Sequence, residues 1–422
     1  MTTPSKKIEQ LAEIILHGRT VDEVRARLEP DDQTPYSRFP HGRGCDPEAV
    51  ATRWHHINGG GENTKIPEAI YHGEDLTVYN ANIENCIGTV KIPVGLAGPL
   101  RVNGSFAKGD YYLPLATTEA ALVASYHRGA VLISTAGGCS AVLLGEGVTR
   151  SPGFAFDSIG DMLGFSHWIL THKEKLHEIS AQTTSHGKLQ DIRFAAQGNH
   201  LYLLCDFATG DAAGQNMVTI ATQAICEYII ANTPITPSYW FIEANASGDK
   251  KATAQSFTTV RGKKVTVEVV IPEKLIHKFL HTTPERMVDY WQMSALGGVM
   301  TGTIGVQGHY ANGLAALFIA CGQDAACVAE AAVGITRFAM RPDNSLYAAA
   351  TLPNMIVGTI GGGTKLPSQQ AALAIMQLAG TGNSRAFAEV CAGAVLAGEI
   401  SIIGSMAAGD FTKAHQDLAR KR

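Results

Sequence analysis

At 422 residues the chain exceeds the size of one ordinary hydrophobic core, so we expect two or three domains. Its residues are 45% hydrophobic and 17% charged, which is sufficient for a large buried interior. The formal net charge of -4 excludes the overall positive field with which proteins hold nucleic acids, so we expect no nucleic-acid partner.

The N-terminal residues 1–30 predict two short helices. Thr20 and Glu23 have the spacing of a capping box for the second helix, and Pro30 ends it. A loop rich in Pro, Gly and Asp follows, to about Gly61.

The chain carries no sign of secretion. Its first residues lack the apolar core of a signal peptide, and Glu9 and Glu13 argue against a transit peptide. Eight cysteines occur without CxxC pairs or finger-like Cys/His spacing, so we expect reduced, packed thiols and no metal site. These features favour a cytoplasmic protein.

Residues 84–150 alternate turns with apolar segments. Val90–Leu100 is an extended run that Pro and Gly interrupt, and Thr117–Ala130 has the periodicity of a helix that starts with Thr-Thr-Glu. The start of such a helix presents free N–H groups to anything bound beside Glu119.

Residues 154–240 change to a mixed pattern after Pro152. The spacing predicts a helix over Ile159–Thr171, a β-hairpin that turns at residues 197–200, and a helix over Asn216–Asn232. A hairpin between two helices indicates a small α+β domain.

The polar turn at residues 248–251 (GDKK) leads into two expected strands, Thr253–Val260 and Val265–Ile271. Between them lies a short basic run, residues 261–264, which we expect to be a solvated turn. The remainder, to Ala408, is dominated by Gly/Ala-rich helices, a composition typical of close packing.

The segment Met293–Gln323 contains no Asp, Glu, Lys or Arg and is long enough to span a bilayer. Seven glycines interrupt it, together with Gln307, His309 and Asn312. We therefore expect a packed interior or a subunit contact there, and no membrane partner.

Strings spread over residues 80–416 resemble the hydroxymethylglutaryl-coenzyme A reductase family, and its class I, the eukaryotic and archaeal type, more than class II. They follow the family's order: ENCIGTVKIPVGLAGPL, PLATTEAALVASYHRGA, GDAAGQNM, GDKKATA, IACGQDAA, VGTIGGGT and AAGDFTKAH. The resemblance implies an α+β fold, with a large helix-rich domain around a central long helix and an inserted, small ferredoxin-like α+β domain. The domains that the resemblance implies are a helical N-terminal segment (1–75), a catalytic acyl-CoA-binding domain (76–151 and 242–422) and an inserted dinucleotide-binding domain (152–241).

The resemblance also implies an activity: reduction of an acyl-CoA thioester to a primary alcohol in two hydride transfers, through a bound aldehyde. The leading hypothesis is conversion of hydroxymethylglutaryl-CoA to mevalonate. NADPH is the expected cofactor, with NADH not excluded; no GxGxxG follows a strand, so this expectation depends on the resemblance alone. It further implies a soluble homo-oligomer, a dimer or dimer of dimers, with sites at the subunit interface.

Four residues match the family's catalytic positions. Lys250 would stabilise the oxyanion that forms when hydride attacks the carbonyl, and Glu119 would protonate the aldehyde oxygen. Asp324 would couple to both and His415 would protonate the departing thiolate.

Further positions match the family's binding residues. Those for the acyl-CoA are Ser125, Arg128, Arg150, Glu243, Asn245, Asp249, Lys251, His309 and Asn312. Those for the dinucleotide are Thr184, Ser185, Asp211, Gly214, Gln215, Asn216, Met217, Gly361 and Gly362.

The sequence departs from the family where the substrate carboxylate binds. Arg150 is retained, but Glu243 occupies the serine position and Met293 the lysine position. At about 4 Å and an effective dielectric near 20, two like charges repel by roughly 4 kcal/mol. A dicarboxylic acyl group therefore binds poorly unless Glu243 turns away or pairs with Arg150.

The cofactor segment departs as well. Residues 184–186 read Thr-Ser-His where class I members have Ser-Arg-Phe, so the arginine that would clamp a 2′-phosphate is absent. Ala213 and Gln215 replace methionines of the family's string.

Two alternatives stand beside the leading hypothesis. The departures at the carboxylate site favour a diverged member that reduces an acyl thioester without a distal carboxylate, and a third hypothesis is a non-catalytic acyl-CoA-binding homologue. A panel of acyl-CoA substrates, with NAD(P)H consumption as the readout, separates all three hypotheses.

Overall fold

The computed structural model describes residues 16–30, 33–35, 37–60, 66–184 and 187–409. The chain divides into two compact units, Met1–Val90 and Lys91–Arg422. The first of the two expected N-terminal helices lies outside the described residues.

The first unit contains α2 (Val21–Leu28), α3 (Pro47–Ile57) and the 3-10 helix η2 (Thr77–Tyr79). The expected capping box is confirmed: the Thr20 hydroxyl accepts from the Glu23 N–H, and the Glu23 carboxylate accepts from the Thr20 N–H. A small core gathers around Val50 and Trp54 of α3. Arg53, beside them, donates to the carbonyls of Gly42, Gly44 and Cys86 and so ties the surrounding loops together.

The second unit is built on one sheet, in which the order β7-β4-β6-β3-β8-β10-β9 forms the main path. β1 pairs with β2 and β3, and β5 pairs with β6. The strands are β1 (Val94–Gly104), β2 (Lys108–Ala116), β3 (Cys139–Arg150), β4 (Gly153–Ala155), β5 (Lys188–Gln197), β6 (His200–Ala208), β7 (Tyr239–Phe241), β8 (Gly262–Ile271), β9 (Ile335–Met340) and β10 (Leu346–Met355).

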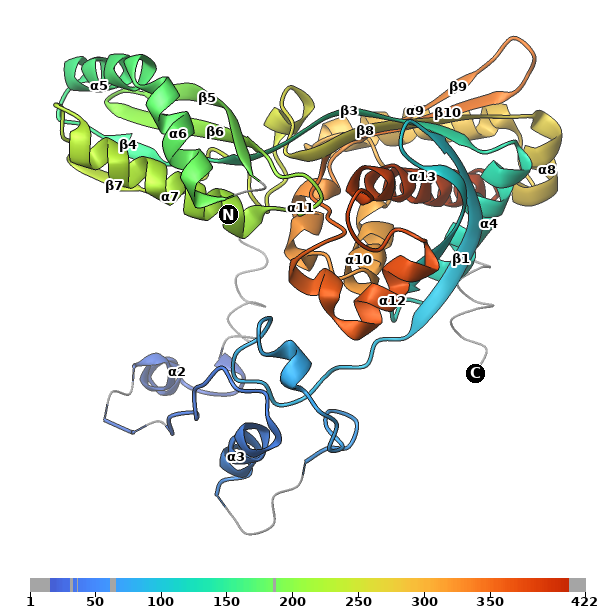
Figure 1. Cartoon of the computed structure of the whole chain (residues 1–422). Helices are drawn as coiled ribbons and strands as arrows, with labels where there is room; N and C mark the ends of the chain where they lie inside the picture. The colour runs from blue at the N-terminus through green and yellow to red at the C-terminus, as the bar shows by residue number, and fades with distance from the viewer. Residues whose placement is uncertain (1–15, 31–32, 36, 61–65, 185–186, 410–422) are drawn as a thin grey trace. The chain divides into compact units, whose positions relative to one another are not determined.

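Helices cover this sheet at both ends. Figure 1 shows α5, α6 and α7 beside β4–β7, and α4, α10, α12 and α13 gathered under β3, β8 and β10. The helices are α4 (Leu122–Thr135), α5 (Ile159–Thr171), α6 (Lys173–Thr183), α7 (Gln215–Asn232), α8 (Glu273–Leu280), α9 (Pro284–Thr301), α10 (Tyr310–Ala320), α11 (Val328–Ala331), α12 (Pro367–Ile375) and α13 (Ser384–Ala408), with 3-10 helices η3 (Ala254–Phe257), η4 (Ala325–Cys327) and η5 (Gly362–Lys365). The expected α+β class is confirmed.

Strand β3 joins the two halves of the sheet. Its first residues pair with β1 and β8, and its last three, Val148–Arg150, pair with β6. Arg150 therefore stands where the two groups of helices meet.

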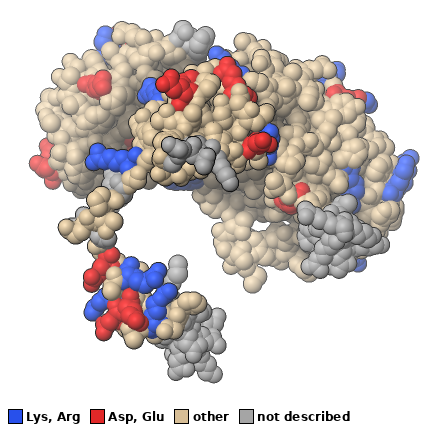
Figure 2. Space-filling view, turned by 90° about the horizontal axis from the view of Figure 1, so that it is seen from below, with Lys and Arg blue, Asp and Glu red and all other residues tan. Residues whose placement is uncertain are grey.

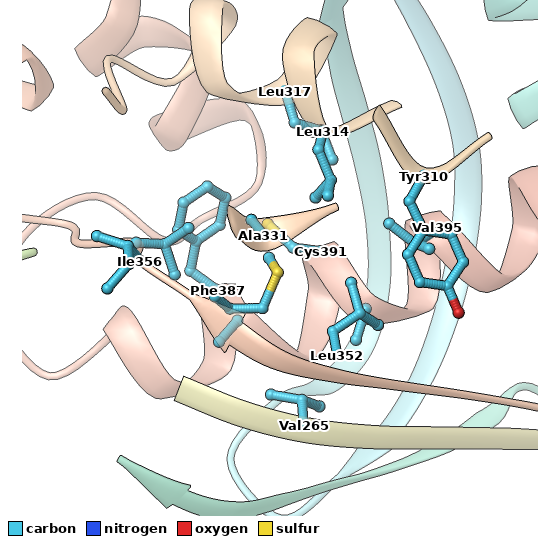
Figure 3. Packing of buried hydrophobic residues seen from close by; sticks show 14 of the residues in the cluster. Val265, Tyr310, Leu314, Leu317, Ala331, Leu352, Ile356, Phe387, Cys391 and Val395 are labelled. Carbon is cyan, nitrogen blue, oxygen red and sulfur yellow. The ribbon is translucent and has the colours of Figure 1, made fainter. Parts of the chain in front are cut away.

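Helix α13 is the centre of the large group. Phe387, Cys391 and Val395, four residues apart, form one buried face between strand residues such as Leu352 and helix residues such as Leu314 (Figure 3). Within the described part of the chain, α13 is the one helix long and apolar enough to cross a membrane, and 94% of its most apolar window is buried in the protein. Burial of this kind is typical of a core helix.

Glycine allows α4 and α13 to approach closely. A Cβ atom on Gly129 of α4 would lie 1.9 Å from the carbonyl oxygen of Ala397, and Gly398 of α13 packs directly on the Tyr126 ring. The expected close packing of Gly/Ala-rich helices is seen at this crossing.

Some expected elements are wrong. The helix expected from Thr117 begins only at Leu122, because Ala121 takes a left-handed conformation (φ 70°) and Glu119 remains in the preceding loop. The strand expected at Thr253–Val260 is the 3-10 helix η3. The hairpin of β5 and β6 and the helix Ile159–Thr171 are confirmed.

Figure 2 shows Lys/Arg and Asp/Glu sparse and interspersed over most of the face in view, and crowded together in the small part at lower left. All eight cysteines are free and buried, as expected for packed thiols.

Candidate active site

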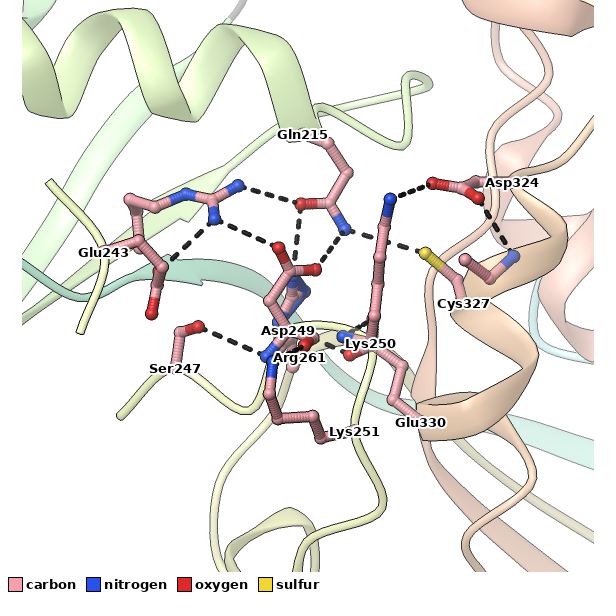
Figure 4. Close-up of polar contacts among 12 residues, drawn as sticks. Gln215, Glu243, Ser247, Asp249, Lys250, Lys251, Arg261, Asp324, Cys327 and Glu330 are labelled. Atoms are coloured by element: carbon pink, nitrogen blue, oxygen red, sulfur yellow. Dashed lines mark hydrogen bonds and ion pairs between the residues drawn. The ribbon is translucent and has the colours of Figure 1, made fainter. Parts of the chain in front are cut away.

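Lys250 and Asp324 form an ion pair. The Lys250 Nζ lies 2.9 Å from Asp324 Oδ2, and both side chains are partly exposed, at 45% and 41% (Figure 4). The hydrogen bond to Asp324 is the main reason why the pKa of Lys250 is raised above its usual value, so the amine is a cation at neutral pH. Asp324 is itself fixed, because its other oxygen caps η4 by accepting from the Ala326 N–H.

The turn that carries Lys250 has an unusual backbone. Gly248 and Lys250 both have positive φ angles, 76° and 56°. A left-handed conformation is uncommon for lysine and persists only where surrounding contacts hold it. Here the Lys250 N–H donates to Glu330 Oε1, 3.2 Å away.

A cluster of charges lies beneath this turn. Asp249 accepts from the guanidinium groups of Arg150 and Arg261 and from the Gln215 amide. Burial would raise the pKa of Asp249, but Arg261 and Arg150 outweigh it and hold the pKa below the usual value. Asp249 is therefore ionised and belongs to the framework of the site.

Glu243 pairs with Arg150, one of the two arrangements that the sequence left open. Its Oε2 lies 3.3 Å from Arg150 NH1, and it also accepts from the Ser151 N–H, while its Oε1 accepts from the Asn245 N–H. Arg150 is 9% exposed and has Asp249 and Gln215 as further partners. The guanidinium is thus neutralised by the chain's own carboxylates.

Glu119 lies in a neighbouring hollow of about 400 Å³, lined also by Thr117, Asn312 and Ile319. Its carboxylate accepts from the Asn312 amide at 3.2 Å. Among the described contacts, none joins Glu119 to Lys250 or Asp324. The expected coupling of the three therefore stays a prediction.

A larger pocket of about 590 Å³ brings Asp324 together with the residues predicted to hold the dinucleotide. Its lining includes the start of α7, with Gly214, Gln215, Asn216 and Met217, and the glycine loop with Gly361 and Gly362.

The pocket suits a pyrophosphate. Gly214 precedes α7 with φ 79° and no side-chain cap, so the first N–H groups of this helix are free to bind an anion. Gly361 and Gly362 have positive φ, and a Cβ at either would meet open space. A ligand can therefore approach the backbone of this loop closely.

Other predicted cofactor residues do not line this pocket. Asp211 accepts from the N–H groups of Gly382 and Ser384 and so anchors the start of α13. Burial would raise its pKa, but these hydrogen bonds lower it below the usual value. Thr184 contacts Met217 Sδ, and Ser185 lies outside the described residues.

The predicted coenzyme A residues on α4 contact α13. Ser125 Oγ lies 2.9 Å from Ser401 Oγ, and Arg128 donates to Ser401 and Ser405. His309 stacks on Tyr126, and its backbone N–H donates to the buried Glu399.

The remaining predicted residues are Lys251 and His415. The Lys251 Nζ folds back onto the Asp249 carbonyl. His415 lies outside the described residues, so its role stays a prediction.

The sequence did not indicate two charged residues of the site, Arg261 and Glu330. The run 261–264 was expected to be a solvated turn, which is wrong, because Arg261 and Lys263 are each 3% exposed. Arg261 pairs with Asp249 and with Glu330, whose side chain is fully buried. Basic residues next to glycine in a run of this kind give no signal of burial, since the acids that pair with them are distant in sequence.

Comparison with known proteins identifies relatives over most of the chain. A family model described as hydroxymethylglutaryl-coenzyme A reductase matches residues 49–420. A Pyrococcus horikoshii protein named 3-hydroxy-3-methylglutaryl-coenzyme A reductase is 43% identical over 347 residues, which cover 80% of this chain and 84% of that protein. An Aeropyrum pernix protein of the same name is 43% identical over 394 residues, covering 91% and 93%.

A solved structure has a similar fold. The class II 3-hydroxy-3-methylglutaryl-CoA reductase of Streptococcus pneumoniae, bound to NADPH in open conformations, has a TM-score of 0.64 and 20% identity, covering 78% of this chain and 89% of that one.

Proposed function

The chain belongs to the hydroxymethylglutaryl-coenzyme A reductase family, and we propose that Lys250 and Asp324 form the centre at which it reduces hydroxymethylglutaryl-CoA to mevalonate with NADPH. One observation supports this assignment above the others. The Lys250 ammonium is held 2.9 Å from a carboxylate that lines the dinucleotide pocket, so it lies beside the place where hydride is delivered.

The chemistry requires stabilisation of negative charge on the thioester oxygen. When bound, NADPH would supply hydride to the carbonyl carbon, once for the thioester and once for the aldehyde. The Lys250 ammonium stabilises the oxyanion that develops in each step, and Asp324 keeps the amine protonated and oriented. When the carbon–sulfur bond breaks, His415 donates a proton to the thiolate, and Glu119 donates one to the aldehyde oxygen in the second step.

The pocket residues fit the cofactor. The free N–H groups at the start of α7 and the open glycine loop at Gly361 and Gly362 would hold the pyrophosphate. Gln215 and Asn216 would contact the nicotinamide end, since they share the pocket with Asp324. The Thr-Ser-His sequence at residues 184–186 offers no arginine for a 2′-phosphate, so use of NADH as well as NADPH is part of the proposal.

Stoichiometry tests this function. With hydroxymethylglutaryl-CoA as substrate, we expect two NADPH oxidised for each coenzyme A thiol released, followed by absorbance at the nicotinamide band and by a thiol reagent. One NADPH per thiol would indicate release of the aldehyde, and no oxidation on this substrate would contradict the proposal.

The ion pair between Glu243 and Arg150 favours a second candidate substrate, an acyl-CoA without a distal carboxylate. The guanidinium already has two carboxylate partners, so a substrate carboxylate has to displace Glu243 to reach it. Turnover on uncharged acyl groups alone would select this candidate.

We also propose a cytoplasmic homo-oligomer, a dimer or dimer of dimers, with sites at the subunit interface. Helix α9 presents exposed apolar side chains, Met293, Leu296, Val299 and Met300, which suit a subunit contact. A second subunit would also bring further groups to Glu119, which among the described contacts does not reach Lys250.

A further inference from the structure

Glu330 is a fully buried carboxylate that contacts the proposed catalytic lysine. It lies on α11, six residues after Asp324. A buried carboxylate is costly unless it is paired. Glu330 is paired with the Lys250 N–H, 3.2 Å from Oε1, and with Arg261 Nε, 3.3 Å from Oε2.

The same short segment therefore holds Lys250 at both ends. Asp324 bonds its Nζ and Glu330 bonds its backbone N–H, and both acids belong to residues 324–331, which η4 and α11 make rigid (Figure 4). The backbone contact falls on a residue with φ 56°, where the conformation depends on its surroundings. Without it, the turn loses one of the contacts that keep Lys250 in the left-handed region.

Arg261 contacts the turn at a second residue. Its Nη2 atom bonds Asp249, the residue before Lys250, and its Nε atom pairs with Glu330. Arg261 is 3% exposed, so it cannot exchange these partners for water. The backbone of the turn is thus held through Glu330 and Arg261 together.

We propose that Glu330 is a positioning residue that sets the place of the Lys250 ammonium relative to the dinucleotide pocket, by accepting the Lys250 N–H and fixing the backbone of the turn. This inference rests on the proposed function, in which Lys250 is catalytic. Glu330 does not touch substrate; it acts through Lys250.

The test compares three variants in the full-length enzyme. Glu330→Ala removes the acceptor, and Glu330→Gln keeps an oxygen at the same place without the charge. The matched control is Glu389→Ala on α13, another fully buried acid that accepts backbone N–H groups, those of Phe106 and Ala107, and that takes no part in the proposed site.

We expect Glu330→Ala to lower kcat on the order of a hundredfold, the scale of a misplacement of about 1 Å. KM for the acyl-CoA should change less than about threefold, since Glu330 does not bind it, and Glu330→Gln should restore kcat to within about tenfold of the native value. Glu389→Ala should lower the thermal unfolding midpoint at least as much as Glu330→Ala, with kcat nearly unchanged.

Two outcomes would overturn the inference: native kcat in Glu330→Ala, or an equal loss of kcat in Glu389→Ala at equal loss of stability. Lys250→Ala, measured in parallel, separates this failure from failure of the proposed function. If Lys250→Ala is inactive while Glu330→Ala is native, only the positioning role is wrong; if Lys250→Ala is active, the proposed function itself fails.

Discussion

The charge of Arg150 is balanced within the chain. Glu243 and Asp249 lie 3.3 and 3.0 Å from its NH1 atom, and the side chain is nearly buried, so salt screens these pairs only weakly. A substrate carboxylate that binds beside Arg150 competes directly with Glu243. Under the proposed function, Glu243 is therefore the residue expected to discriminate between acyl groups with and without a distal carboxylate.

Replacing Glu243 with Ser tests this competition. We expect KM for hydroxymethylglutaryl-CoA to fall at least about tenfold, because the removed repulsion is as large as roughly 4 kcal/mol. KM for an acyl-CoA without a distal carboxylate serves as the control and should stay nearly constant. Equal changes for the two substrates in steady-state kinetics would contradict the role given to Glu243.

The raised pKa of Glu330 makes the free energy of unfolding depend on pH. Burial raises its pKa from 4.5 to about 7, Asp249 adds to the rise, and Arg261, the Lys250 N–H and Cys327 oppose it. Between these values the unfolded chain has lost the proton that the folded chain keeps, so the contribution of Glu330 to stability falls as pH rises. Above about pH 7 the contribution stays constant.

We therefore expect Glu330→Gln to gain stability relative to the native chain between about pH 5 and about pH 8, by on the order of 3 kcal/mol. Urea unfolding at a series of pH values measures the difference. A difference that is constant with pH would show that the pKa of Glu330 is unshifted, and one that shrinks as pH rises would show that the pKa is lowered; either result would contradict the raised pKa.

The sequence predicts part of the site. Lys250 and Asp324 stand in short motifs, GDKK and CGQD, and the structure brings their side chains together. Arg261 and Glu330 could not be found this way, because a buried ion pair between residues distant in sequence leaves no local pattern. The sequence also could not decide whether Glu243 pairs with Arg150, because that contact depends on where strand β3 ends.

At the scale of elements, the crossing of α4 and α13 depends on glycine. We expect Gly129→Ala to destabilise the protein by at least about 1–3 kcal/mol, because the added Cβ would lie 1.9 Å from the Ala397 carbonyl oxygen, which is backbone and cannot rotate away. The free energy of unfolding in urea measures this.

The matched control is Gly160→Ala on α5, where an added Cβ meets only the Ser158 Oγ, at an ordinary contact distance of 3.5 Å. Alanine has the higher helix propensity, so this variant should be neutral or more stable by up to about 1 kcal/mol. A Gly129 variant as stable as the Gly160 variant would contradict the close approach of the two helices.

Elements with local signals were predictable and those with distant partners were not. The β5–β6 hairpin has alternating residues and a Gly-containing turn, and α5 has a serine cap and helical period. Strand β10 was missed because Leu346–Met355 is rich in alanine and forms a strand through its pairing with β8 and β9. The start of α4 was placed too early because Thr117 and Thr118 look like caps, whereas the chain turns at Ala121.

At the scale of the whole molecule, strand β3 connects the two parts of the sheet. It passes from the helices around α13 to the β4–β7 group and ends at Arg150, beside the charge cluster. The pocket takes one wall from the start of α7 and another from the glycine loop after β10. Any relative shift of these walls changes the distance between the cofactor site and Asp324.

The exposed apolar face of α9 predicts assembly. Leu296→Glu places a charge on this face, where Leu296 is 67% exposed, and we expect the oligomer to dissociate and activity to fall with it. Light scattering at matched concentrations measures the mass. Ile159→Glu on α5, 57% exposed in the native chain, is the control and should leave the mass unchanged. A native chain that is an active monomer would refute the proposed assembly.

The most direct test of the whole account is the activity of Lys250→Ala beside that of Lys251→Ala, two lysines of one turn. Lys250 bonds Asp324, whereas Lys251 bonds a backbone carbonyl. We predict that NADPH oxidation with hydroxymethylglutaryl-CoA falls on the order of a thousandfold in Lys250→Ala, as expected for loss of an oxyanion-stabilising group, with a nearly native thermal midpoint. Lys251→Ala, at a position predicted to bind the acyl-CoA, should raise KM while kcat stays near the native value; a Lys250→Ala enzyme that turns over at the native rate would contradict the proposed mechanism.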